Sequence, residues 1–265
     1  MQFKNLIAFM AVLITLVACN NDETILNSNE KGKLEVEFDN IFSGADLTLN
    51  NQLNTTSQGE NLKIGKIKYI VSNIVLTKED GTVFVYPKNQ SYFIVDESDE
   101  TKRVLELQDV PVGNYTQIKF GIGVDQAQYN LGATGQGDFL AQAEAADMLG
   151  SWDAGYKFIA FEGTFTSNTV SSDTPFMVHT GKTASNYNYT EITLSMPDKA
   201  LVRTKITPEI HIMADVNKII DGANKIKLSD NTAGGMGAMI MSGNNVSLIT
   251  ANLQEMFSVN HVHND

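Results

Sequence analysis

The fold is decided by the stretch from residue 148 to residue 163, which reads MLGSWDAGYKFIAFEG. A small polar turn follows Trp152, and from Tyr156 to Glu162 two sets of side chains alternate with a period of two, which predicts a β-strand. Trp152, the only tryptophan of the chain, therefore lies where a loop meets a strand. A large aromatic side chain at such a junction is partly accessible, which suits a binding site. The alternative is that Trp152 only plugs one end of a β core.

The same two-residue period recurs on both sides of this stretch. It is found in residues 34–39, 62–77, 92–96, 104–107, 118–124, 176–181, 189–196 and 207–216. Turn signals separate these segments about every dozen residues, as they do in all-β domains. The pattern predicts an all-β fold, an Ig-like β-sandwich of roughly eight or more mainly antiparallel strands.

Three segments depart from this period. Residues 139–148 are rich in alanine and free of β-branched side chains, which predicts a short helix. Residues 245–257 have apolar side chains at helical spacing, which predicts a second, terminal helix. The glycine-rich residues 234–243 predict a mobile loop. They also hold three thioethers that could bind Cu(I), although packing of the loop against the core is the interpretation that we favour: Met236, Met239 and Met241.

The N-terminal residues 1–18 predict a signal peptide, because one lysine precedes an apolar run too short to span a membrane. Residues 16–19 resemble a bacterial lipobox, so we expect Cys19 to carry acyl chains that anchor the protein in the outer membrane. The acidic pair that follows resembles the surface-export signal of Bacteroidetes lipoproteins. We expect residues 19–33 to be the lipidated cysteine and a flexible tether, and residues 34–265 to be the folded domain.

Composition excludes some functions. The chain has 31 acidic and 19 basic residues, with a net charge of −12, so its surface repels phosphate backbones and we expect no binding to nucleic acid. Cys19 is the only cysteine, which leaves no intramolecular disulfide and no thiolate metal site in the mature chain. No phosphate-binding loop and no nucleophile with a matched base can be identified, so we expect a non-catalytic protein.

The four histidines are candidate metal ligands. His261 and His263 form a His-Val-His sequence, and extended backbone would place both imidazoles on one side, about 7 Å apart. Such a pair can share a metal ion or simply be solvated. His179 lies just before Gly181 at a predicted turn, and His211 lies on the polar face of a predicted strand, where a lone histidine is more often not a ligand.

A family resemblance is carried by four segments together, residues 69–76, 110–125, 148–163 and 176–181. They resemble the MbnP-like copper-binding family, named after the partner protein of methanobactin operons. The resemblance implies an extracytoplasmic β-sandwich that binds copper, with Trp152 and His179 at positions of the family's copper segments. It also implies a di-haem peroxidase-like partner, which in better known members oxidises a tryptophan to kynurenine. This chain has Gly150 where the family segment commonly has a second tryptophan.

We therefore expect an exported, lipid-anchored copper-binding protein in which copper is bound by His179 and one of three other histidines: His211, His261 and His263. A different class of protein remains open. The sandwich could be a glycan-binding, protein-binding or structural module of a surface lipoprotein whose histidines are incidental. The metal content of the protein purified after growth in copper distinguishes the two, because such a module would hold no stoichiometric metal.

Overall fold

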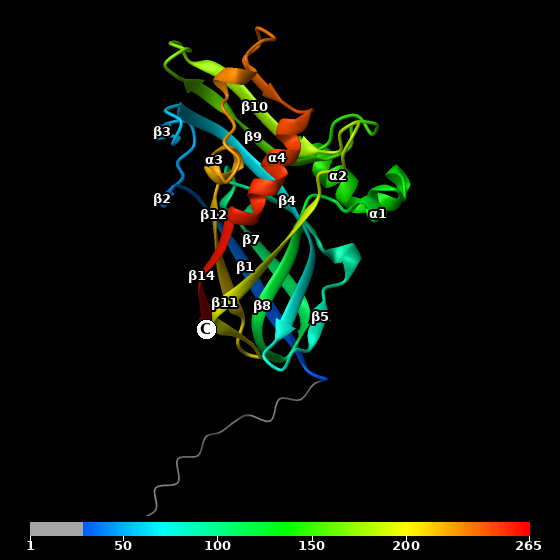
Figure 1. The fold of residues 1–265 in the computed structure, drawn as a ribbon. Helices are drawn as coiled ribbons and strands as arrows, with labels where there is room; N and C mark the ends of the chain where they lie inside the picture. Colours follow the sequence, from blue (N-terminus) through cyan, green and yellow to red (C-terminus); the bar gives the residue numbers. More distant parts are fainter. Residues whose placement is uncertain (1–28) are drawn as a thin grey trace, which may run out of the picture.

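The computed structural model describes residues 29–265, which form two β-sheets packed face to face (Figure 1). The all-β sandwich expected from the alternating pattern is confirmed, with fourteen strands in residues 29–265. The predictions for the signal peptide, for Cys19 and for the first part of the tether fall outside the described residues.

The five-stranded sheet has the order β14-β12-β1-β2, and β7 also pairs with β1. Its strands are β1 (Lys31–Phe42), β2 (Ala45–Asp46), β7 (Val104–Pro111), β12 (Pro208–Asp215) and β14 (Phe257–Asn264). β1 and β12 run parallel, whereas β2, β7 and β14 pair antiparallel with their neighbours. The parallel pair brings together segments that are far apart in the chain.

The nine-stranded sheet has the order β11-β8-β4-β9-β10-β13, and three short strands pair with β4. Its strands are β3 (Asn54–Thr55), β4 (Asn61–Lys78), β5 (Val83–Val85), β6 (Tyr92–Asp96), β8 (Gly113–Ile122), β9 (Lys157–Thr166), β10 (Thr174–Gly181), β11 (Thr190–Val202) and β13 (Ala238–Ile240). β13 corrects the prediction of a loop over residues 234–243. Gly237 is needed there because its φ is +95° and a Cβ would lie 2.1 Å from the Pro175 carbonyl oxygen.

The helices are short. They are α1 (Gln126–Tyr129), α2 (Asp138–Ala145), α3 (Lys218–Asp221) and α4 (Asn244–Asn252), with 3₁₀ turns at η1 (Lys88–Gln90), η2 (Glu100–Lys102), η3 (Ala133–Gln136), η4 (Ser229–Asn231) and η5 (Leu253–Glu255). α2 and α4 are the two predicted helices, and the single turns α1 and α3 were not predicted. The terminal helix ends earlier than expected, and β14 follows it. Within residues 29–265, no helix has both the length and the apolar character needed to cross a membrane.

The start of the folded domain lies slightly before the expected boundary. The fold begins at Lys31 and not at residue 34, because Gly32 pairs with Val110 in β7, at a point where a Cβ would lie 2.2 Å from the Arg203 carbonyl oxygen. Gly32, inside the expected tether, makes this close approach possible. Ser43 and Gly44 have φ of 51° and 86°, which reverses the chain after β1.

The main core lies between the sheets and fixes the last strand. Phe38 of β1 contacts the rings of Tyr69, Phe120 and Phe257 edge to face, with centroids 5.9, 5.5 and 6.1 Å away. Each such pair stabilises the fold by about 1 kcal/mol beyond the area that it buries. Phe257 is the first residue of β14, so the core holds this strand where it enters the sheet.

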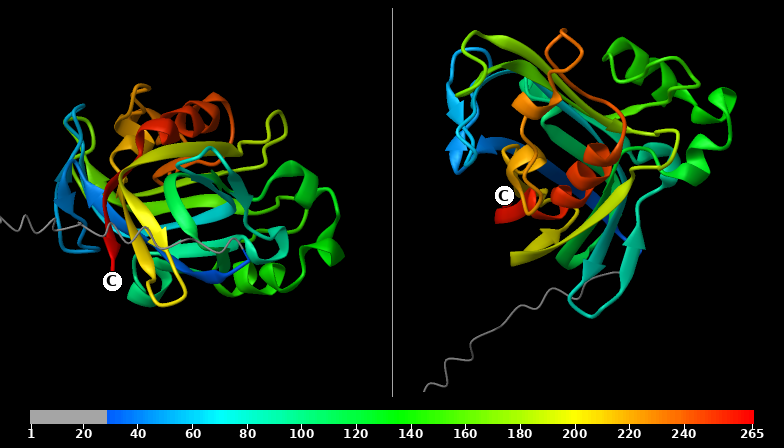
Figure 2. Two further views of the ribbon diagram at one scale, coloured as in Figure 1. Left: turned by 90° about the horizontal axis from the view of Figure 1, so that it is seen from below. Right: turned by 45° about the horizontal axis from the view of Figure 1, so that its top comes forward.

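A second, smaller hydrophobic cluster lies on the outer face of the nine-stranded sheet. Phe158 and Ala160 of β9 contribute to it, together with Phe139 of α2 and Met148 of the loop that follows. α1 and α2, drawn in green, cover this face on the side away from the C-terminal strand (Figure 2). The Trp152 loop is part of this cover.

Candidate metal centre

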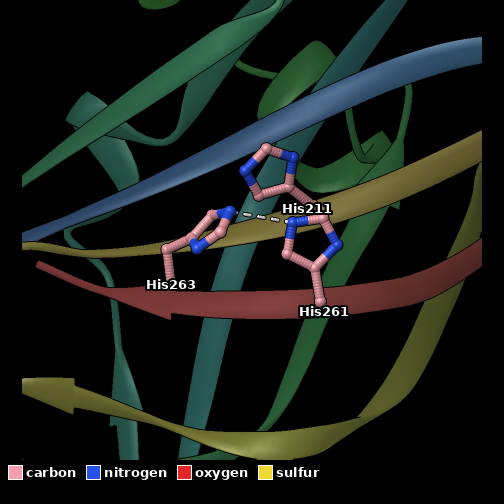
Figure 3. A group of neighbouring side chains, drawn as sticks. All are labelled: His211, His261 and His263. Atoms are coloured by element: carbon pink, nitrogen blue, oxygen red, sulfur yellow. Dashed lines mark hydrogen bonds between the residues drawn. The ribbon is translucent and has the colours of Figure 1, made fainter.

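Three histidines converge on the outer face of the five-stranded sheet (Figure 3). The rings of His211 and His261 stack at 4.2 Å with an interplanar angle of 17°. The ring of His263 lies 5.1 Å from His211 and 4.6 Å from His261, nearly perpendicular to both. One nitrogen of each ring can be chosen so that the three atoms lie within 4.8 Å of one another. A cluster of three imidazoles at this spacing can hold one metal ion.

Strand register accounts for the position of His211 and His261. They are direct partners in the antiparallel pair of β12 and β14, so their side chains share a face. On β12 the neighbours Ile210 and Ile212 are fully buried in the main core, which turns His211 outward.

A β-bulge in β14 turns the other two histidines outward. His261 pairs with His211, but Val259 pairs with Ile212, so Asn260 is an extra residue in β14. Val259 packs against the core before the bulge and Val262 does so after it. Strict alternation from Val259 would have directed residues 261 and 263 inward; the bulge directs both to the outer face.

The carboxylates around His211 distinguish its two nitrogens. Its Nδ1 lies 2.8 Å from Oε2 of Glu37, and Asp39 lies 3.7 Å from the same nitrogen. An ionised carboxylate cannot supply a hydrogen, so the close contact with Glu37 favours the neutral tautomer that has its hydrogen on Nδ1 and a lone pair on Nε2. That Nε2 is buried and has no hydrogen-bond partner among residues 29–265. A carboxylate oxygen of Glu209 lies 3.4 Å from it but makes no hydrogen bond, since it has no hydrogen to donate when ionised.

The other two rings interact directly. Nε2 of His261 and Nε2 of His263 lie 3.0 Å apart, and Nδ1 of His261 lies 3.1 Å from Oδ1 of Asn260. With Nδ1–H of His261 donating to Asn260, Nε2–H of His263 donates to the lone pair on Nε2 of His261. Two nitrogens bound to one tetrahedral ion at about 2.0 Å stand about 3.3 Å apart. The observed pair is therefore close to the separation that a shared ion requires.

The electrostatic surroundings favour a cation. Desolvation lowers the pKa of the His261 imidazole, and neighbouring His211 and His263 lower it further, so the neutral form that binds metals is favoured. Desolvation raises the pKa of Glu37, and nearby Asp39 raises it further. Bringing a positive ion to this face would relieve the repulsion between the carboxylates.

A second set of donors shares one histidine with this cluster. Glu37, Asp39 and His211 also offer one ligand atom each within 4.8 Å of one another. Carboxylate oxygens suit harder cations than imidazole does. Because Glu37 holds Nδ1 of His211, these carboxylates act in this structure as support for the imidazole cluster.

His179 does not join the three other histidines. It lies on β10 of the nine-stranded sheet, and its Nε2 is 2.8 Å from Oε1 of Glu162. Glu162 is also paired with Lys66 at 3.1 Å. Burial lowers the pKa of His179 and outweighs the opposing effect of the Glu162 carboxylate. The expected pairing of His179 with a second histidine is not found, because the other three lie on the opposite sheet.

Trp152 lies at a junction of loop and strand, as expected, but away from the three-histidine cluster. Its ring stacks on Tyr129 at 4.9 Å and meets Tyr156 edge to face at 6.2 Å. The Tyr129 hydroxyl donates to the Trp152 carbonyl oxygen over 2.9 Å. The indole is half-buried in the smaller hydrophobic cluster, which fits the alternative that it closes one end of a β core.

Sequence reasoning missed the part played by β1. Glu35, Glu37 and Asp39 were visible as the polar face of the first strand. Their relation to the histidines depends on the parallel register that places Glu37 beside His211. No local signal in either segment indicates that these two strands are neighbours.

Comparisons with known proteins agree with the fold. A family model described as MbnP matches residues 31–242. Among solved structures, MbnP from Methylosinus trichosporium is similar, with a TM-score of 0.51 and 12% sequence identity over 81% of this chain and 82% of that one. At this identity the structural likeness shows the fold alone. Comparison with curated proteins gave no match. His179 and His211 lie inside the matched residues, whereas His261 and His263 lie beyond them.

Proposed function

This chain belongs to the MbnP family, and from that premise we propose that it is an exported, non-catalytic copper-binding protein. The copper is held by three imidazoles, those of His211, His261 and His263. The observation that carries the proposal is the buried Nε2 of His211, an acceptor without a hydrogen-bond partner in the described chain, beside the pair formed by His261 and His263.

The donor set fits copper chemically. Neutral imidazole binds both oxidation states of copper, and of the divalent first-row metals Cu²⁺ binds most tightly to a given nitrogen site. The site contains no thiolate, which suits an oxidising compartment outside the cytoplasm. Glu37 and Asn260 each hold the second ring nitrogen of a ligand, and such partners orient the imidazole and raise its basicity. The protein's part is therefore to bind and retain the ion.

The proposed location follows from the N-terminal sequence. The lipobox-like residues 16–19 support an outer-membrane lipoprotein anchored through Cys19. The family resemblance supports a di-haem peroxidase-like partner, for which Trp152 is the one tryptophan available. The net charge of −12 supports the view that nucleic acid is not a partner.

A titration of the purified, metal-free protein with Cu(II) tests the proposal. We expect about one equivalent to bind tightly, with nitrogen hyperfine structure in the electron paramagnetic resonance spectrum from imidazole ligands. The triple variant His211→Ala, His261→Ala, His263→Ala should lose this signal. His179→Ala is the matched control, since His179 lies on the other sheet, and it should keep the signal.

Two outcomes would contradict the proposal. Copper binding that survives in the triple variant and is lost in His179→Ala would place the Cu(II) site on the nine-stranded sheet. No stoichiometric Cu(II) in the wild-type protein would favour the other class, a glycan-binding, protein-binding or structural module with incidental histidines.

A further inference from the structure

The outer face of the five-stranded sheet holds a second set of donor atoms beside the three-histidine cluster. Glu37, Asp39 and His211 each offer one such atom, and these atoms lie within 4.8 Å of one another. Glu37 is the direct partner of His211 in the parallel pair of β1 and β12. Asp39 follows Glu37 by two positions, so its side chain lies on the same face of β1. The strand register therefore brings two carboxylates to the Nδ1 side of the His211 ring.

The distances between these donor atoms suit one shared ion. Nδ1 of His211 lies 2.8 Å from Oε2 of Glu37 and 3.7 Å from Oδ2 of Asp39. Donor atoms that bind one tetrahedral zinc ion at about 2.0–2.2 Å stand about 3.3–3.6 Å apart. The two observed distances lie on either side of this range, so small rotations of the carboxylates would bring all three atoms to a common ion.

Burial and charge at this set also favour a cation. The side chains of His211 and Glu37 are 15% and 21% exposed, whereas that of Asp39 is 37% exposed and leaves access from solvent. Within residues 29–265, neither carboxylate forms an ion pair with a lysine or an arginine. Other partly buried carboxylates are paired with lysines, as Asp96 and Asp221 are at 2.8 and 2.7 Å. A divalent cation would offset the repulsion between Glu37 and Asp39.

We propose that Glu37, Asp39 and Nδ1 of His211 bind a second cation, Zn(II), so that the imidazole of His211 bridges it to the copper on Nε2. The inference rests on the proposed function for that copper and adds a neighbouring ion to it. Zn(II) binds imidazole nitrogen and carboxylate oxygen, commonly with three protein ligands and one water molecule. Mg²⁺ and Ca²⁺ take six or more ligands, chiefly oxygen. The Zn(II) ion replaces the hydrogen on Nδ1, which leaves to solvent as a proton, and no electron is transferred.

Electron paramagnetic resonance distinguishes a bridged pair of ions from two separate sites. Cu(II) binds nitrogen and oxygen sites more tightly than Zn(II) does, so a second equivalent of Cu(II) is a probe of this set. Two Cu(II) ions on the two nitrogens of one imidazole ring couple antiferromagnetically. In the full protein with His179→Ala, which removes the imidazole on the other sheet, we expect the integrated signal to rise until one equivalent of Cu(II) is bound. It should fall as the second equivalent binds, and a signal that doubles instead would overturn the proposal.

Asp39→Asn tests the ligand set with Zn(II) itself. In the copper-loaded His179→Ala protein we expect about one equivalent of Zn(II) to bind, and Asp39→Asn should weaken this binding by about tenfold or more. The nitrogen hyperfine structure from the first Cu(II) should remain, because the three imidazoles are intact. Glu35→Gln is the matched control, since Glu35 lies on the same face of β1 but outside the set. Equal losses of Zn(II) affinity in the two variants would overturn the proposal.

A variant with His261→Ala and His263→Ala separates this proposal from the proposed copper site. It removes two of the three copper ligands and keeps the two carboxylates and His211. We expect it to bind about one equivalent of Zn(II), with an affinity that Asp39→Asn lowers. This result would support the ligand set even where the copper titration of the wild type fails. Tight binding of one Cu(II) by the wild type, with no Zn(II) bound in either protein, would overturn the second ion and leave the proposed copper site intact.

Discussion

At the scale of single residues, His211 has two nitrogens with different surroundings. Nδ1 is held by Glu37, and Nε2 is buried without a hydrogen-bond partner among the described residues. A buried polar atom left without a partner costs free energy of about 1–3 kcal/mol. Binding an ion there would remove that cost, so His211 is the centre of the proposed copper site.

Glu37 should position His211 for binding. In Glu37→Gln the side chain no longer carries the charge that holds Nδ1–H, and the ring can turn or change tautomer. We expect the affinity for Cu(II) to fall by about tenfold to a hundredfold, with little change in the melting temperature. Isothermal titration and thermal unfolding measure the two quantities.

Glu106→Gln is the control for charge. Glu106 is exposed on β7 and pairs with Glu35. The substitution therefore removes one negative charge from the same sheet without changing a contact of His211 Nδ1. Its affinity for Cu(II) should stay close to that of the wild type. Equal losses in the two variants would show that the net charge of the face matters and that the contact of Glu37 with Nδ1 of His211 does not.

At the scale of elements, the bulge at Asn260 decides what β14 contributes. Phe257 and Val259 lie on the core side of the strand, and the extra residue shifts the alternation so that Val262 packs inward and the histidines face outward. One inserted residue thereby converts two core positions into ligand positions.

Deleting Asn260 should abolish the three-histidine site. The strand would resume strict alternation, which directs both imidazoles toward the core and Val262 toward solvent. We expect the loss of Cu(II) binding and a fall of about 2 kcal/mol or more in the free energy of unfolding, because buried imidazoles need partners. Denaturant unfolding and Cu(II) titration check this.

Asn260→Ala separates the effect of the extra residue from the effect of its side chain. It keeps the extra residue and removes only the hydrogen bond to Nδ1 of His261. We expect it to retain Cu(II) with a modest loss of affinity. If the deletion variant binds Cu(II) as the wild type does, the end of β14 must pair with β12 in another register. The bulge would then not be needed to direct the histidines outward.

At the scale of the whole molecule, the sandwich separates His179 from the three-histidine cluster. The five-stranded sheet presents the three imidazoles and the nine-stranded sheet presents His179, with the main core between the sheets. The family match ends at residue 242, so it includes His179 but not β14. The three-histidine site thus depends on a strand beyond the matched stretch.

The lipid anchor is also a property of the whole chain. When the full sequence is expressed in a bacterium that processes lipoproteins, we expect the protein to incorporate labelled fatty acid and to fractionate with membranes. Cys19→Ser removes the only cysteine and should give an unlabelled protein outside the membrane fraction. A Cys19→Ser protein that stays with the membranes would show that another feature attaches it.

Local patterns in the sequence determined the strands, because alternation of apolar and polar side chains records which face of a strand is buried. They also determined α2 and α4, whose composition or spacing is helical over a few turns. His179, His211, His261 and His263 were identifiable as candidates because imidazole is uncommon in this chain and chemically suited to metals.

Only the tertiary structure decided which of these candidates meet. β1 pairs with β12, a strand about 170 residues later in the chain, and this register places Glu37 beside His211. The choice of neighbouring strand depends on how whole faces pack together in the core. The bulge at Asn260 and the placement of His179 on the opposite sheet follow from the same packing. Sequence spacing carries no record of such long-range register, because each strand shows only which of its faces is buried and not which strand lies beside it.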